Sequence, residues 1–257
     1  MTDILKLTRN GHVLEVVFDR PPVNAIDAAT SRRIAKAFIE FREDPELRVA
    51  ILTGVGDRVF SAGWDLKAAE SEDTDWGPGG FAGLTRLDLN KPVIAAVNGR
   101  AIGGGFELAL CCDIIVAAEN ADFSLPEAER GVVADAGGLQ TFPRRVPHHV
   151  AMEMLLTGRR MPAAEAMQWG LVNAVVPRAQ LMDKAREYAR VIADGAPLSV
   201  QATKEVIRAI EGMPIQDTYA FLKKRTLPIY TKMLTSEDHV EGPRAFAEKR
   251  KPVWKGR

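Results

Sequence analysis

Apolar and polar positions change their spacing along the first part of the chain. Residues 5–9 and 12–19 roughly alternate apolar and polar side chains on either side of Asn10-Gly11, which is typical of a β-hairpin. From Asp27 onward the spacing becomes helical. The apolar positions of this predicted helix share one face: Ile34, Phe38 and Phe41.

Three short and almost wholly apolar runs follow, each before or after a turn signal. They are residues 49–53, 93–97 and 113–117. Such runs are typical of buried parallel strands, whose two faces are both covered. Because these strands alternate with helical stretches, the sequence predicts a layered α/β fold with crossover connections.

The second part of the chain is mostly helical. After about residue 150, helical spacing recurs in four stretches separated by glycine and proline: 151–157, 163–169, 180–194 and 197–211. The sequence therefore predicts an α/β core followed by helices, the first of which pack on that core. Residues 75–83, DWGPGGFAG, are rich in glycine and predict an ordered but mobile loop.

Charge and cysteine content exclude several classes of protein. The 34 basic and 34 acidic residues cancel, so no global field attracts nucleic acid or an anionic membrane. Cys111 and Cys112 are neighbours, a poor arrangement for a structural disulfide, which favours a reducing compartment. The N-terminus lacks the apolar core of a signal peptide, and no run of about 18 apolar residues is present. These features predict a cytoplasmic protein.

Two glycine-containing turns are candidates for binding an anion through the backbone. Residues 60–65 follow the first buried strand, and residues 103–107 follow the second and lead into a helix. Backbone N–H groups at a helix N-terminus have no partner within the helix, and donors from two loops can form an oxyanion hole. The alternative is that these glycines only turn the chain, which is the more common role of a lone glycine triplet.

Three carboxylates lie near these turns. Glu107 falls on the first turn of the helix that follows the glycines, and Glu127 follows Pro126. Together they suggest an acid and base pair of the kind that dehydration requires. Taken singly, Glu107 would be a partner of the helix dipole and Glu127 a solvated loop residue. Asp135, among small residues, is either a third functional acid or a helix N-cap.

Other mechanisms lack the necessary motifs. The four histidines show no zinc-binding spacing, so no metal site is expected. The sequence has no nucleophile elbow, no phosphate-binding loop and no dinucleotide fingerprint. Residues 223–225 form a short basic cluster, which in a neutral chain is usually a solvated helix face.

The ordered motifs resemble the enoyl-CoA hydratase/isomerase (crotonase) superfamily over essentially the whole chain. They are DRP at 19–21, NAI at 24–26, FSAGWDL at 60–66, NG at 98–99, GGGFE at 103–107, LPE at 125–127, GG at 137–138, PR at 143–144, TGR at 157–159 and EGPRAFAEKR at 241–250. The resemblance implies a spiral of ββα units in residues 1–195. Residues 196–257 would form a helical region for assembly as a homotrimer or a dimer of trimers.

The resemblance also implies roles for individual residues. The backbone N–H groups of Trp64 and Gly104 would bind the oxygen of an acyl-CoA thioester. In the dehydration direction, Glu127 would take the α-proton and Glu107 would protonate the departing hydroxyl. Coenzyme A enters only as part of the substrate, and no permanently bound cofactor is expected. The residues expected to contact it are Val23, Ala25, Ala62, Asp65 and Leu66, with Phe246 and Lys249 from the same or a neighbouring subunit.

Within the superfamily, five strings resemble dehydratases whose acyl group carries a trimethylammonium cation: SAGWDLKAA, GPGGFAGLT, GGGFELAL, SEDHVEG and PVWKGR. Such a cation is usually bound by aromatic faces and carboxylates. The residues expected in this acyl pocket are Trp64, Trp76 and Phe81, with Asp135 adding charge or acting as an auxiliary acid. Three alternatives remain: a hydratase for uncharged short acyl groups, an isomerase acting through Asp135, and a non-catalytic scaffold or RNA-binding relative.

Overall fold

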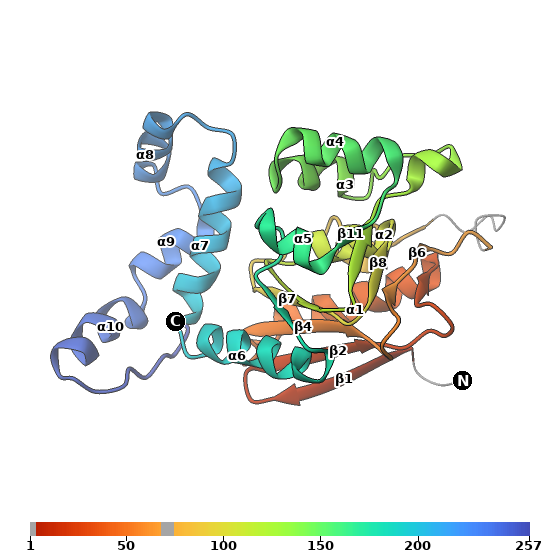
Figure 1. The fold of residues 1–257 in the computed structure, drawn as a ribbon. Coiled ribbons are helices and arrows are strands. Elements are labelled where there is room, and N and C mark those ends of the chain that lie inside the picture. Colours follow the sequence, from red (N-terminus) through yellow and green to blue (C-terminus); the bar gives the residue numbers. More distant parts are fainter. Residues whose placement is uncertain (1–3, 68–74) are drawn as a thin grey trace.

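The computed structural model describes residues 4–67 and 75–257, and a six-stranded sheet lies at its centre (Figure 1). Its strands, in spatial order, are β1 (Leu5–Asn10), β2 (Val13–Phe18), β4 (Val49–Gly54), β7 (Val93–Val97), β9 (Ile114–Ala118) and β12 (Ala174–Val176). The β1–β2 pair is antiparallel and turns at Gly11, as the hairpin pattern predicted. All the other neighbouring pairs in this sheet are parallel.

Shorter strands form two further sheets beside the first. A four-stranded sheet has the order β11 (Met161–Pro162), β10 (Asp122–Ser124), β8 (Arg100–Ile102) and β5 (Val59–Ser61), and β3 (Ala25–Ile26) pairs with β6 (Gly63–Trp64). Along the chain, β4 is followed by β5, β7 by β8, and β9 by β10. The chain therefore passes three times from the large sheet to the smaller one, as expected for a spiral of ββα units.

Helix α1 (Ala28–Glu43) follows β3 and begins where its sequence provides a cap. The Asp27 carboxylate accepts a hydrogen bond from the backbone N–H of Thr30 at 2.7 Å, which satisfies one of the free donors of the first turn. The apolar positions predicted to share one face are all fully buried: Ile34, Phe38 and Phe41. The predicted helix and its buried face are therefore confirmed.

The remaining helices surround the sheets or extend from them. They are α2 (Gly104–Leu110), α3 (Gly138–Thr141), α4 (His148–Thr157), α5 (Ala163–Gln168), α6 (Leu181–Ala193), α7 (Pro197–Ile210), α8 (Ile215–Lys223), α9 (Pro228–Leu234) and α10 (Glu237–Ala247). Short 3₁₀ turns are η2 (Phe81–Gly83), η3 (Glu127–Arg130), η4 (Phe142–Arg144) and η5 (Arg178–Gln180). Helices α7–α10 form an arm on one side of the sheets (Figure 1). None of the helices in the described ranges is long and apolar enough to cross a membrane.

Both faces of the large sheet are covered, which explains its continuous apolar runs. In β4, Val49 and Ile51 pack in a cluster with α6, whereas Ala50 and Leu52 belong to the main core that includes α1. Successive side chains of a strand point to opposite faces, so every residue of β4 is buried.

The structure differs from the sequence prediction in two places near the site. The segment 60–65 was predicted as a turn, but it contains parts of β5 and β6, and β8 precedes the glycines of 103–105. Strands this short carry too few residues to show an alternating pattern. The segment predicted as a mobile loop is buried at its C-terminal end, where Ala82 packs against α1 and its N–H donates to Ser31 Oγ at 3.0 Å.

This bond makes Ser31 a test of how α1 holds η2 in place. Both Ser31 and Ala82 are fully buried, so Ser31→Ala would leave the Ala82 N–H without an acceptor. We expect a loss of about 1–3 kcal/mol in the free energy of unfolding, measured by urea denaturation at a fixed protein concentration. Ser199→Ala, at an exposed serine of α7, is the matched control and should change stability by less than about 0.5 kcal/mol. Equal stability of the two variants would contradict the assigned bond.

Candidate active site

One cavity of about 440 Å³ collects most of the residues predicted to act together. The predicted donors and acids that line it are Trp64, Gly104, Glu107, Glu127 and Asp135, and the predicted pocket aromatics are Trp76 and Phe81. Val132, Val133 and Ala136 complete the lining. The sequence contained no signal for these three, because isolated apolar residues in an irregular segment show no periodicity.

Gly63 brings the two predicted oxyanion segments together. Its backbone lies so close to the start of α2 that a Cβ atom would stand 2.6 Å from the Gly104 nitrogen and 2.7 Å from the Ile102 oxygen. Its φ of +77° also favours glycine. The backbone of Trp64, the next residue, is therefore held beside the first turn of α2.

The orientation of the backbone leaves donors on this wall of the cavity. The first N–H groups of α2, including that of Gly104, have no acceptor within the helix. The Asp65 N–H donates to the Ile26 oxygen at 2.9 Å, and neighbouring N–H groups of a strand point in opposite directions. The N–H of Trp64 thus points away from β3. This arrangement suits the binding of a developing oxyanion.

Aromatic rings form the adjoining wall. The Phe81 ring packs against Gly104, where an added Cβ would lie 2.4 Å from Phe81 Cε1. The Trp76 ring meets the Phe81 ring edge-on at 5.2 Å and the Trp64 ring edge-on at 6.5 Å, measured between ring centroids. The predicted aromatic residues therefore form one connected surface, to which α1 contributes by holding η2.

Glu107 lies on the first turn of α2 and is almost completely buried, with 4% of its surface exposed. Its Oε1 accepts a hydrogen bond from the Gly138 N–H at 2.9 Å, at the start of α3. Burial raises the pKa of Glu107 to about 7, and the negative charges of Glu127 and Asp135 act in the same direction, although the bond from Gly138 opposes them. The carboxyl therefore exchanges its proton near neutral pH.

Glu127 begins the 3₁₀ turn η3 and is half-buried, rather than the solvated loop residue that the single-residue interpretation allowed. Its Oε1 lies against Gly103, where an added Cβ would be 2.7 Å away. Its Oε2 is buried and has no hydrogen-bond partner among the described residues. Burial raises the pKa of Glu127, and the Arg130 charge partly opposes this. The free oxygen is available to a proton donor in the cavity.

Asp135 lies in the segment before α3 and its side chain is exposed. Gly137, not Asp135, occupies the N-cap of α3, and no side chain caps that helix. The alternative role of Asp135 as a helix N-cap is therefore wrong. Among the described residues, no group of three or more His, Cys, Asp or Glu side chains is arranged to hold a metal ion.

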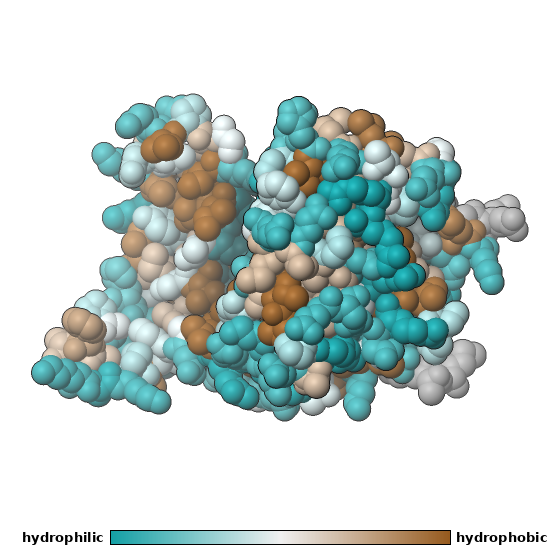
Figure 2. Space-filling view, in the orientation of Figure 1, coloured by the Kyte–Doolittle hydropathy of each residue, from teal (hydrophilic) through white to brown (hydrophobic). Residues whose placement is uncertain are grey.

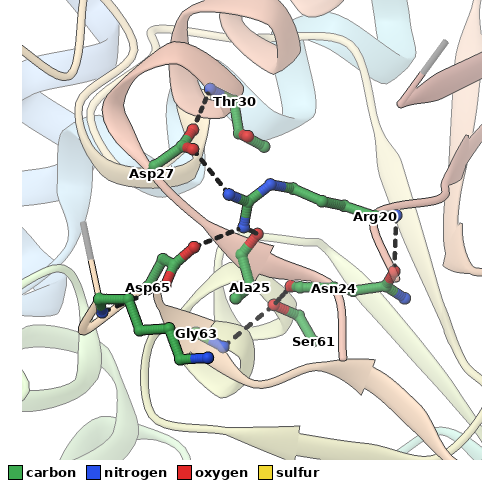
Figure 3. A network of polar contacts seen from close by, with 9 residues as sticks. Arg20, Asn24, Ala25, Asp27, Thr30, Ser61, Gly63 and Asp65 are labelled. Carbon is green, nitrogen blue, oxygen red and sulfur yellow. Dashed lines mark hydrogen bonds and ion pairs between the residues drawn. The ribbon is translucent and has the colours of Figure 1, made fainter. Parts of the chain in front are cut away.

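An arginine not singled out by the sequence analysis holds β3 and β6 together (Figure 3). Arg20 Nη1 donates to the Ala25 oxygen at 2.7 Å and to Asp65 Oδ2 at 2.8 Å, and its Nη2 donates to Asp27 Oδ2 at 2.8 Å. The guanidinium thereby connects the strand before α1 with the residue that follows Trp64. The only signal in the sequence was its place in the DRP motif.

A second set of bonds supports the same strand pair from within. Ser61 is fully buried, and its hydroxyl donates to the Asn24 oxygen at 2.7 Å and accepts from the Gly63 N–H at 3.1 Å (Figure 3). The Asn24 side chain in turn accepts from the Arg20 N–H at 2.9 Å. The position of Gly63, and with it that of Trp64, is thus set by residues from two distant segments.

The residues predicted to contact coenzyme A divide into two groups in space. The first group follows the β3–β6 edge and contains Val23, Ala25, Ala62, Asp65 and Leu66, with the Ala62 N–H donating to the Val23 oxygen at 3.0 Å. Phe246 and Lys249 lie in or just after α10, at the far end of the arm from β6 (Figure 1). Phe246 is 87% exposed. Within one chain, the structure does not bring these two residues to the cavity.

The raised pKa of Glu107 predicts a change in stability with pH. Its ordinary value is 4.5, so the folded chain binds this proton more tightly than the unfolded chain, and the buried charge opposes folding increasingly as the pH rises toward 7. Glu107→Gln keeps an acceptor for Gly138 and removes the charge. We expect the variant to be more stable than the wild type by about 2–3 kcal/mol at about pH 8, with little difference at about pH 4.

Thermal and urea unfolding at both pH values would measure this difference. Glu46→Gln, at an exposed position, is the control and should leave the stability close to that of the wild type throughout. If Glu107→Gln gains no stability at the higher pH, burial of the ionised Glu107 carboxylate does not lower the free energy of unfolding, and the prediction is wrong.

Comparison with known proteins agrees with this geometry. The enoyl-CoA hydratase/isomerase family model matches residues 8–257. A carnitinyl-CoA dehydratase of Salmonella paratyphi A is 58% identical over 261 aligned residues and covers 100% of both chains. An enoyl-CoA hydratase from Mycobacterium tuberculosis has a TM-score of 0.92 at 40% identity, covering 99% of each chain. A carnitinyl-CoA hydratase from Mycobacterium avium has a TM-score of 0.79 at 41% identity, covering 100% of each chain.

These similarities confirm the predicted α/β spiral and extend over the cavity and the arm alike. The chain belongs to the enoyl-CoA hydratase/isomerase family.

Proposed function

We propose that this protein is a hydro-lyase that catalyses the reversible dehydration of carnitinyl-CoA to crotonobetainyl-CoA. The observation that carries the proposal is the composition of the cavity. The buried Glu107, the half-buried Glu127, two backbone donor segments and an aromatic wall face the same space, with a third carboxylate beside them. The full-length likeness to the Salmonella dehydratase supports the choice of acyl group.

In this mechanism the backbone N–H groups of Trp64 and Gly104 bind the thioester oxygen. Loss of the α-proton places negative charge on that oxygen, and donors already in position stabilise the charge without reorganisation. One such donor contributes about 3–4 kcal/mol in a comparable oxyanion hole. The Gly63 contact with α2 keeps the two donor segments together.

Two proton transfers complete the dehydration. Glu127, whose Oε2 has no partner among the described residues, takes the α-proton as the C–H electrons move into the enolate. Glu107 gives its proton to the β-hydroxyl, so that the C–O bond breaks, the double bond forms and water leaves. A pKa of about 7 allows Glu107 to act as an acid in this direction and as a base in hydration.

The charge of the cavity favours a cationic acyl group. The lining contains the carboxylates of Glu107, Glu127 and Asp135, and no lysine, arginine or histidine of the described residues belongs to it. The rings of Trp64, Trp76 and Phe81 add negative faces of the kind that attract quaternary ammonium groups.

The coenzyme A part of the substrate would follow the β3–β6 edge, where Arg20 acts as a positioning residue. Phe246 and Lys249 would contact it from a neighbouring subunit of a homotrimer or a dimer of trimers, with residues 196–257 as the region of assembly. Apolar residues are exposed on the surface of this arm (Figure 2), which supports such assembly. They include Ile207, Ile215, Tyr219, Val240, Phe246 and Val253. We place the enzyme in the cytoplasm, where acyl-CoA thioesters are available.

Double-bond isomerisation is a second candidate, because Asp135 provides a third acid in the same cavity. Hydration of an uncharged short acyl-CoA would use the same glutamates and backbone donors. The residues that line the acyl pocket would determine whether the enzyme prefers the uncharged or the cationic acyl group. A non-catalytic scaffold or RNA-binding role is disfavoured by the glutamate pair that lines the cavity and by the zero net charge.

The absorbance of the conjugated thioester tests the proposed reaction directly. We expect Glu107→Gln and Glu127→Gln each to lower kcat for hydration of crotonobetainyl-CoA by about 10²–10⁴-fold, because each removes one proton transfer. Glu129→Gln, at an exposed neighbour on η3, is the matched control and should retain wild-type kcat. Retention of kcat by either of the first two variants would exclude its residue from the mechanism.

Trp76 tests the aromatic recognition of the cation. Trp76→Leu should lower kcat/KM for crotonobetainyl-CoA about 3- to 30-fold more than for crotonyl-CoA, since a cation–π contact contributes about 0.5–2 kcal/mol. Steady-state rates with both thioesters give the comparison. Equal losses on the two substrates would mean that the ring only packs the wall.

A further inference from the structure

We infer that Asp135 is the fixed counterion of the cationic acyl group and the residue that makes the cavity selective for it. This inference rests on the proposed function and extends it from the proton transfers to substrate choice. It assigns Asp135 a role in binding, distinct from the acid and base roles of Glu107 and Glu127.

The first argument is that the Asp135 carboxylate is unused by the protein. It lines the cavity together with both glutamates, and no hydrogen bond or ion pair to its side chain is found within the described ranges. Two carboxylates of the neighbouring β3–β6 edge, Asp65 and Asp27, are by contrast paired with Arg20. A carboxylate that lines a ligand cavity and has no partner in the protein can form an ion pair with a cationic group of the ligand.

The second argument concerns how far each carboxylate is buried. Glu107 and Glu127 are withdrawn from water, and this burial favours their neutral forms. Asp135 is exposed to solvent at the edge of the same cavity. Its charge acts on both glutamates, which places it within electrostatic reach of the reacting part of the substrate.

The third argument is the chemical nature of the surroundings. Asp135 is flanked in the cavity lining by Val132, Val133 and Ala136. A primary ammonium group would need several hydrogen-bond acceptors here, which these side chains do not supply. A trimethylammonium group has an apolar methyl surface and a diffuse charge. It can therefore contact the apolar side chains while the carboxylate balances its charge.

The alternative role of Asp135 is proton transfer, as the isomerase hypothesis requires. The two roles differ in what they demand of the substrate. A counterion distinguishes a charged from an uncharged acyl group, whereas a proton-transfer group is needed for both. A substrate pair of equal shape and different charge therefore separates the two roles.

The experiment compares crotonobetainyl-CoA with its neutral isostere, in which a carbon atom replaces the quaternary nitrogen. The Asp135→Asn variant keeps the side-chain size and removes the charge. We expect the ratio of its kcat/KM for the cationic thioester to its kcat/KM for the isostere to fall about 10-fold below the wild-type ratio. Asp135→Glu keeps the charge and should retain most of the wild-type preference.

The dependence of substrate preference on ionic strength is an independent measurement, because a purely structural role of Asp135 would not change it. The ratio of the two kcat/KM values should fall with added salt in the wild type and should be nearly independent of salt in Asp135→Asn. If Asp135→Asn loses activity with both thioesters, calorimetric binding of the corresponding saturated thioesters still measures the preference. If Asp135→Asn no longer binds the cationic saturated thioester more tightly than the neutral one, the inference is supported. If the variant retains this preference in binding, the inference is overturned.

Failure of the inference and failure of the proposed function look different. A wild-type enzyme that prefers crotonobetainyl-CoA, together with an Asp135→Asn variant that keeps this preference, overturns the counterion alone. A wild-type enzyme that hydrates the isostere but not crotonobetainyl-CoA overturns the proposed function and the counterion with it.

Discussion

The close contact between Gly63 and the start of α2 is the constraint on which the site depends. No side chain fits between the two backbones, since an added Cβ would approach the Gly104 nitrogen to 2.6 Å. The contact places the end of one strand beside the first turn of a helix, and both provide free N–H groups. Ser61 and Asn24 hold Gly63 from one side, and Arg20 holds the following Asp65 from the other. Backbone geometry, rather than a charged side chain, thus creates the anion-binding part of the cavity.

Elements from other parts of the fold form the remaining walls of the cavity. Helix α1 holds the turn with Phe81 through Ser31, and the ring then covers Gly104. Helix α3 donates the Gly138 N–H to Glu107, which limits how far burial raises its pKa. Because every wall derives from a different part of the spiral, the cavity exists only when the three sheets are assembled.

The electrostatic character of the cavity follows from the same assembly. Burial raises the pKa of Glu107 to about 7 and also raises that of Glu127, while Asp135 retains contact with solvent. Carboxylates and aromatic rings surround the space, and within residues 4–67 and 75–257 no basic side chain lines it. One arrangement therefore serves both the proposed proton transfers and the proposed selection of a cationic acyl group.

Much of this protein follows from its sequence alone. Local spacing was enough to predict the hairpin around Gly11, helix α1 with its buried face, the apolar strands β4, β7 and β9, and the four later helical stretches. The predicted donors, acids and aromatic residues line one cavity, and their motifs, which resemble those of a family, allowed them to be proposed together. Val132, Val133 and Ala136 complete the lining without such a signal. The short strands β5, β6 and β8 were missed, since two or three residues carry no periodic signal. Only the tertiary structure determined three features: the hydrogen bonds of Arg20 to Asp65, the burial that raises the pKa of Glu107, and the distance between Phe246 and the cavity. Each depends on how segments distant in the chain are arranged in space.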